Sequence, residues 1–139
     1  MDVFDMIGPV MIGPSSSHTA GAAKIGYLAQ QELGERVQEA VIEMHGSYAS
    51  AKGYKTDLAI IGGLLGMQQD DERLRDAFEI AKQQGMKYQF CRVDLGEDVD
   101  LNTARITAKG NSRCIRLTAS SIGGGVVEVL QTEELTKEE

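Results

Sequence analysis

The sequence predicts an α+β domain with a mixed, mainly antiparallel sheet and helices packed on one face, in the order α-β-α-β-β-β. Before Gly85, apolar residues recur mostly at helical spacing, whereas 103–109 and 114–121 alternate apolar with polar residues, as half-buried strands do. The chain shows no regular strand-helix-strand repetition, which disfavours a doubly wound parallel sheet. These observations together indicate helices layered on one sheet.

The first predicted helix begins among residues 15–19 and ends at Gly34. Serine or threonine ahead of an apolar run is a typical helix cap, because its side-chain oxygen accepts a hydrogen bond from a free backbone N–H group. Glycine directly after such a run is a typical stop. The apolar positions that share the helical spacing are Ile25, Leu28, Ala29 and Leu33.

A strand is expected next, over 37–44, ending at His45. The apolar run 58–67 fits either a buried helix or a strand, because periodicity alone does not separate the two. Thr56 and Asp57 precede this run and offer a cap and a first-turn acid. We therefore predict a helix there.

Asp70 or Asp71 is expected to cap a further helix, which Gly85 ends. A second strand follows over 86–94, and its apolar side chains predict that it is covered. The alternating segments come next, separated by a turn at Gly110.

After these strands, a last strand is predicted over 126–131, following a glycine-rich turn. At 139 residues the chain is long enough for one domain with its own core, which we place at 1–131. The polar and mostly acidic segment 132–139 is expected to be a tail or linker.

The net charge of the chain disfavours two classes of partner. Its formal net charge is −7 at pH 7, which disfavours binding to nucleic acid or to an anionic membrane surface. No apolar run approaches the ~20 residues that cross a bilayer, and no basic leader precedes one. We therefore expect a cytoplasmic protein.

Cysteine and histidine are too few to predict a metal site within this chain. Cys91 and Cys114 are too far apart for a Cys-x-x-Cys motif, and there are only two histidines. A disulfide between the cysteines is disfavoured in a reducing compartment.

The stretch 8–26 holds both prolines of the chain, each directly after a glycine, which predicts a shaped loop. Neutral hydrogen-bonding side chains then crowd the predicted helix start, where free N–H groups and the helix dipole favour a small anion. One serine could equally cap the helix while the rest are solvated. The crowded side chains are Ser15, Ser16, Ser17, His18 and Thr19.

The segment Ile12-Gly-Pro-Ser-Ser-Ser-His-Thr-Ala-Gly resembles the signature of the β chain, or β domain, of the bacterial iron–sulfur-dependent L-serine dehydratases. The resemblance covers nearly the whole chain. Further segments follow in the family's order, among them His45-Gly-Ser-Tyr-Ala, 53–57, 62–66, Asn102-Thr-Ala-Arg and Ser121-Ile-Gly-Gly-Gly.

The resemblance implies a subunit that converts L-serine to pyruvate and ammonia together with an α chain. In the family a [4Fe–4S] cluster held by α-chain cysteines acts as Lewis acid on the leaving hydroxyl. His18 is then a candidate proton carrier, because imidazole titrates near neutral pH. The implied substrate-binding residues are Ser15, Ser16, Ser17, Thr19, Ser47, Thr56, Asp57 and Asn102.

The chain departs from the family in two respects. Where the family commonly has a histidine-bearing Gly-His-x-Thr-Asp segment, this chain has Tyr54-Lys55 ahead of Thr56 and Asp57. Family β chains also commonly continue into a regulatory ACT domain, and this sequence ends before one could begin.

Alternatives remain open at this point. The chain could be a non-catalytic module that binds a small anion or substrate, like the allosteric domain of some D-3-phosphoglycerate dehydrogenases, which the family's β domain resembles. A structural domain without a ligand is the third reading. A homodimer, or contacts to the α chain through an apolar patch, is also expected.

Overall fold

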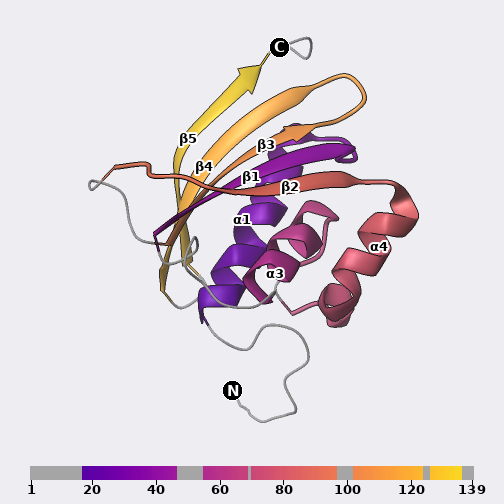
Figure 1. Ribbon diagram of the computed structural model, residues 1–139, viewed down its shortest axis with the longest axis horizontal. Coiled ribbons are helices and arrows are strands. Elements are labelled where there is room, and N and C mark those ends of the chain that lie inside the picture. Colours follow the sequence, from indigo (N-terminus) through magenta and orange to yellow (C-terminus); the bar gives the residue numbers. More distant parts are fainter. Residues whose placement is uncertain (1–16, 47–54, 69, 97–101, 124–125, 136–139) are drawn as a thin grey trace.

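The computed structural model describes residues 17–46, 55–68, 70–96, 102–123 and 126–135. One five-stranded sheet, in the order β2-β1-β3-β4-β5, carries the helices on one of its faces (Figure 1). The α+β class and the one-sided helix layer are therefore confirmed. The strands are β1 (Glu39–Gly46), β2 (Lys87–Arg92), β3 (Asn102–Lys109), β4 (Cys114–Gly123) and β5 (Val126–Leu135).

The helices are α1 (Ser17–Leu33), α3 (Lys55–Leu64), the 3-10 turn η1 (Glu72–Asp76) and α4 (Ala77–Gln84). α1 ends where predicted, at Gly34, which takes the left-handed φ of 76° that favours glycine. The run after Thr56 is a helix, as the cap signal favoured.

The predicted helix between Asp71 and Gly85 forms as two pieces. The Asp71 carboxylate accepts a hydrogen bond from the N–H of Arg73 at 2.8 Å and caps η1, and α4 continues the chain. Gly85, with φ of 77°, ends α4 as expected. The cap is therefore where the sequence placed it, but the first turn is wound more tightly than an α-helix.

The sheet is mixed because β1 pairs with β2 in parallel, while the β1–β3, β3–β4 and β4–β5 pairs are antiparallel. The prediction that the second strand is covered is wrong. β2 lies at an edge of the sheet, and Tyr88 on it is 38% exposed. Four strands follow α4, in the four segments where the sequence predicted them.

The β3–β4 turn lies where predicted, with the N–H of Gly110 donating to the carbonyl of Arg113 at 2.8 Å. β5 continues to Leu135, four residues past its expected end at Gln131, because it stays paired with β4 along its length. The glycine-rich turn between β4 and β5 falls partly on 124–125, outside the described residues.

The core is aliphatic and rich in alanine, and it lies between the helices and the inner face of the sheet. Ala40, Ile42 and Met44 of β1 point inward, whereas Val41 and Glu43 face away from the helices. α1 and α3 pack against each other through two glycines, Gly26 and Gly63. Among the described residues, no helix is long and apolar enough to cross a membrane.

The register defines two ends of the sheet. At the His45 end, the end of β1 lies beside the start of β3 and the end of β4. At the Lys109 end, the starts of β1 and β2 lie beside the end of β3. α1 ends at the Lys109 end, where the Arg113 guanidinium donates to the carbonyl of Leu33 at 2.7 Å. Its first turn therefore lies toward the His45 end, as Figure 1 shows.

Candidate functional site

The first turn of α1 carries the end of the serine-histidine-threonine segment. Ser17, His18 and Thr19 are helical, as predicted, and the structure describes their backbone. Predicted site residues Ser15 and Ser16 lie outside the described residues. The first N–H groups of an α-helix have no intrahelical acceptor, so this turn offers backbone donors to an anion. Within Ser17–Leu33 no acidic residue occupies the first turn, so the described part of α1 supplies no carboxylate to offset this end of the helix dipole.

Asn102 lies at the same end of the sheet, as the first residue of β3. Its register partner is Gly46, the last residue of β1. Ser47, the predicted site residue that follows Gly46, lies outside the described residues. The strand pairing therefore brings the start of β3 beside the chain that leads into the Ser47 segment, although the two are more than fifty residues apart in sequence.

A buried polar row crosses three strands at the His45 end, and sequence reasoning did not assign it to the site. His45 is opposite Thr103, and Thr103 is opposite Ser120. Thr103 and Ser120 are almost fully buried, and their hydroxyl oxygens lie 2.6 Å apart in a hydrogen bond. Buried polar side chains at aligned strand positions are the signal that could have found this row, but it depends on the register.

His45 is held by the chain that leaves β2. Its Nδ1 accepts a hydrogen bond from the backbone N–H of Leu95 at 2.9 Å, and the residue is 7% exposed. An imidazole that accepts at Nδ1 carries its proton on Nε2 when it is neutral. The contact therefore favours the tautomer with its proton on Nε2. It also holds the segment 93–96 against the end of β1.

Asp57 is the acidic residue of the first turn of α3, as predicted, whereas Thr56 lies within that turn rather than capping it, because α3 begins at Lys55. Thr56 is buried and Asp57 is half-buried. Burial raises the pKa of the Asp57 carboxyl above its ordinary value, because the charged form loses water contacts. A cationic group of a ligand beside this carboxylate would lower that pKa again, so the position suits an ammonium.

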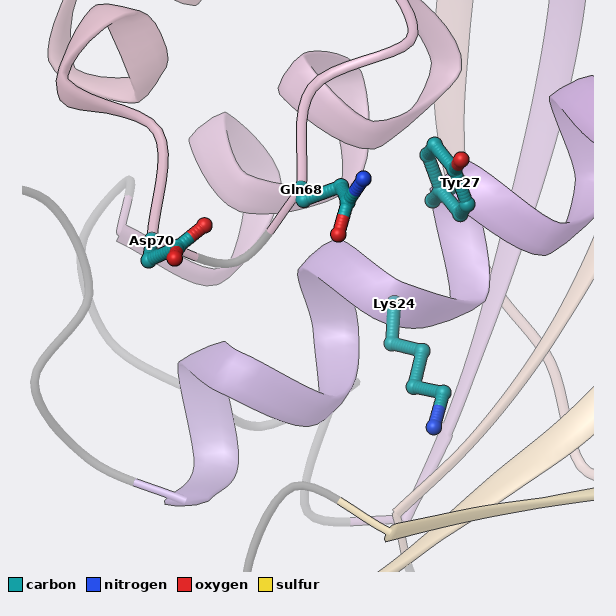
Figure 2. Close-up of a pocket in the computed structure, with 4 residues that line it drawn as sticks. All are labelled: Lys24, Tyr27, Gln68 and Asp70. Atoms are coloured by element: carbon teal, nitrogen blue, oxygen red, sulfur yellow. The ribbon is translucent and has the colours of Figure 1, made fainter.

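A small hollow opens beside α1, with a volume of about 210 Å³ (Figure 2). Lys24 and Tyr27 come from α1, and Gln68 and Asp70 come from the connection after α3. In Figure 2 the Lys24 side chain extends away from Asp70. Neither charged group has an ion-pair partner in the part of the chain that the structure describes. This Lys24 hollow offers one ammonium and one carboxylate to a small polar molecule.

The side chains that the structure describes do not fit an iron–sulfur cluster. Cys91 lies on β2 and Cys114 on β4, with β1 and β3 between them. Three strand spacings are about 14 Å, too far for two thiolates to ligate one cluster. Across the described ranges, no group of three or more His, Cys, Asp or Glu residues is placed to hold a metal ion.

Comparison with known proteins points to one family. A family model described as "Serine dehydratase beta chain" matches residues 2–106. The chain is 48% identical over 130 residues to a probable L-serine dehydratase beta chain of Bacillus subtilis, covering 93% of this chain and 59% of that protein. It is 40% identical over 129 residues to an L-serine dehydratase beta chain of Peptoniphilus asaccharolyticus, covering 91% and 58%.

A third relative carries the same similarity within a longer protein. L-serine dehydratase 1 of Escherichia coli is 31% identical over 155 aligned residues, which cover 91% of this chain and 33% of that protein. The chain thus spans less than two thirds of the length of each of these relatives.

Proposed function

Because this chain belongs to the serine dehydratase beta chain family, we propose that it is the β subunit of an L-serine dehydratase, an L-serine ammonia-lyase. The observation that carries the proposal is the serine-histidine-threonine segment at the start of α1, at the end of the sheet that also holds Asn102. L-serine would lose water to give aminoacrylate, whose imine tautomer takes up water and yields pyruvate and ammonia.

In this proposal the substrate carboxylate binds at the first turn of α1. Free N–H groups and the helix dipole attract it, and the hydroxyls of Ser15, Ser16, Ser17 and Thr19 add donors. Asp57, whose carboxylate is half-buried, suits the substrate ammonium. Ser47, Thr56 and Asn102 complete the proposed binding set.

His18 is the proposed proton carrier. Elimination of water requires a base for the α-proton and a proton for the leaving hydroxyl, and imidazole can exchange protons at neutral pH. Since the described residues do not fit a [4Fe–4S] cluster, we assign the cluster to the α chain. The chain by itself should then be inactive. A cytoplasmic location and a homodimer remain predictions.

The experiment is anaerobic co-expression with the α chain, followed by a pyruvate-release assay. His18→Ala should lower kcat about 100-fold or more, the range typical of a lost general acid or base. Lys82→Ala, an exposed change on α4, is the control and should leave kcat unchanged. Wild-type turnover by a folded His18→Ala complex would refute the catalytic role.

A non-catalytic module that binds a small anion is the second candidate. The observation that favours it is the same α1 terminus, because free N–H groups bind a carboxylate without any chemistry. In that case His18→Ala and Ser16→Ala would shift the response of the complex to a small carboxylate while maximal turnover stays intact. The same kinetic experiment therefore separates the two candidates.

A further inference from the structure

A second, larger hollow lies at the Lys109 end of the sheet, with a volume of about 440 Å³. Three connections meet there: the α1–β1 link at Arg36, the α4–β2 turn at Gly85 and the β3–β4 hairpin at Gly110. Ligand sites typically enclose about 300–1,000 Å³, so this Lys109 hollow is large enough for a small molecule.

The wall of the Lys109 hollow is positively charged. On β1, Glu39 lies directly between Lys87 of β2 and Lys109 of β3 in the strand register. The Lys109 ammonium is 4.0 Å from the Glu39 carboxylate, at the outer limit of an ion pair. Arg36 adds a third cation. Three cations face one carboxylate in a protein whose net charge is −7.

Unlike Arg36 and Lys87, three arginines elsewhere in the described ranges are paired with a carboxylate. Arg73, Arg105 and Arg113 each donate to a carboxylate at 3.1 Å or less. In the described ranges, Arg36 and Lys87 have no such partner. The hollow therefore brings together two positive side chains, Arg36 and Lys87, that no carboxylate of the described ranges pairs with.

A further carboxylate, that of Glu35, lies against Gly110, but it faces the hairpin. It accepts hydrogen bonds from the N–H groups of Ser112 and Arg113, both at 2.8 Å. The Glu35 carboxylate therefore already has hydrogen-bond donors on the hairpin.

The donors available in the hollow are side chains. The backbone N–H groups of Gln38, Lys87 and Gly110 already donate to backbone carbonyls. The charged donors open to a ligand are the Arg36 guanidinium and the two ammonium groups, beside the side-chain amides of Gln38 and Gln84. A guanidinium binds two oxygens of one anionic group at once, and ammonium groups add point charges around it.

We propose that the Lys109 hollow binds a small molecule through a compact dianionic group, with phosphate as the group recognised. The site lies about 20 Å from the proposed substrate site, judged from the six-residue rise along β1 between Glu39 and His45. It goes beyond the proposed lyase function and stands whether or not that function is correct.

The test is a titration of the purified chain followed by backbone amide NMR, with inorganic phosphate and the monoester glycerol 3-phosphate as probes. Sodium chloride at matched ionic strength is the control for general screening. We expect saturable shifts at Gly85, Lys87 and Gly110. Tighter binding of the monoester would identify an ester as the ligand, and equal binding would identify the phosphate group alone.

Two matched variants decide the proposal. Lys87→Gln/Lys109→Gln should weaken phosphate binding about 10-fold, because charge-assisted hydrogen bonds are lost. Arg75→Gln/Arg92→Gln changes the net charge equally at exposed positions outside the hollow, and should leave binding unchanged. Arg36→Gln alone is a third variant and should also weaken binding. Shifts that do not saturate, or an equal loss in both double variants, would overturn the proposal.

Discussion

Gly26 of α1 and Gly63 of α3 meet backbone to backbone where the two helices cross. A Cβ atom on Gly63 would lie 2.9 Å from the carbonyl carbon of Gly26, and one on Gly26 would overlap the carbonyl oxygen of Ile60. Real Cβ atoms do not approach backbone this closely. The two glycines therefore set the distance between α1, which carries the proposed site, and the helix that carries Asp57.

The first prediction follows from this contact. Gly63→Ala should destabilise the chain by about 1–3 kcal/mol or more, because the new methyl group meets rigid backbone of α1 and overpacks the crossing. Gly62→Ala is the matched control on the same helix. Its new methyl group would overlap the Cδ2 end of the buried Leu74 side chain and lie 3.5 Å from the Met67 sulfur, so this variant meets side chains where Gly63→Ala meets backbone.

Chemical denaturation of both variants measures the difference. Alanine gains about 1 kcal/mol over glycine in helix propensity at both positions, so the gap between the variants reports packing. Equal midpoints for Gly62→Ala and Gly63→Ala would show that the helices can separate without cost.

The second prediction concerns Glu43 and Arg105, which face away from the helices on β1 and β3. The Arg105 guanidinium donates to both carboxylate oxygens, at 2.6 and 3.1 Å, and this hydrogen bonding lowers the pKa of Glu43. A lowered carboxyl pKa stabilises the fold above the unfolded-state value of 4.5 and loses its effect as pH falls through the folded-state value.

Glu43→Gln should therefore cost about 0.5–1 kcal/mol near pH 7, since the pair is partly exposed, and nothing once Glu43 is protonated. Urea unfolding of wild type and variant at neutral and acidic pH measures this. A cost that is the same at all pH values would mean that the carboxylate charge contributes nothing.

The third prediction concerns Asp57. Because burial raises its pKa above 3.8, the folded chain holds its proton more tightly than the unfolded chain does, and stability falls as pH rises through that window. Asp57→Asn should therefore raise Tm near pH 7 and leave it unchanged below pH 3.8. A lower Tm at pH 7 would show that attraction to the α3 terminus outweighs burial.

The fourth prediction concerns the hydrogen bond between His45 and the N–H of Leu95. His45→Phe should destabilise the chain by about 1 kcal/mol, because the part-buried N–H group of Leu95 loses its acceptor. His45→Asn places an amide oxygen near the position of Nδ1 and should recover much of that loss. Amide exchange at Leu95 is the direct readout, and exchange that stays as slow in His45→Phe as in the wild type would contradict the acceptor role.

The fifth prediction separates binding from chemistry in the α1 segment. In the reconstituted enzyme, Ser16→Ala should act mainly on KM, whereas His18→Ala should act on kcat. Loss of one cap costs only about 1 kcal/mol, so both variants should remain folded. Thermal melts are the control, and a kcat loss for Ser16→Ala as large as that for His18→Ala would contradict the division.

Local sequence determined much of the fold. The stop at Gly34, the cap at Asp71, the helix after Thr56 and the hairpin at Gly110 were all predictable, because each depends on the conformational preference of one or two residues and their immediate neighbours. The α+β class followed from the spacing of apolar residues, which is mostly helical before Gly85 and alternates in the later strands.

Only the tertiary structure decided which distant residues meet. The edge position of β2, the length of β5, the row from His45 to Ser120 and the cationic Lys109 hollow all depend on strand order and register. A strand's period of two determines which residues share a face, but pairing between strands far apart in sequence is set by packing of the whole sheet against its helices. The candidate site residues could therefore be chosen from the sequence one segment at a time. Which residues lie beside them in space could not be predicted, because that depends on strand order and register.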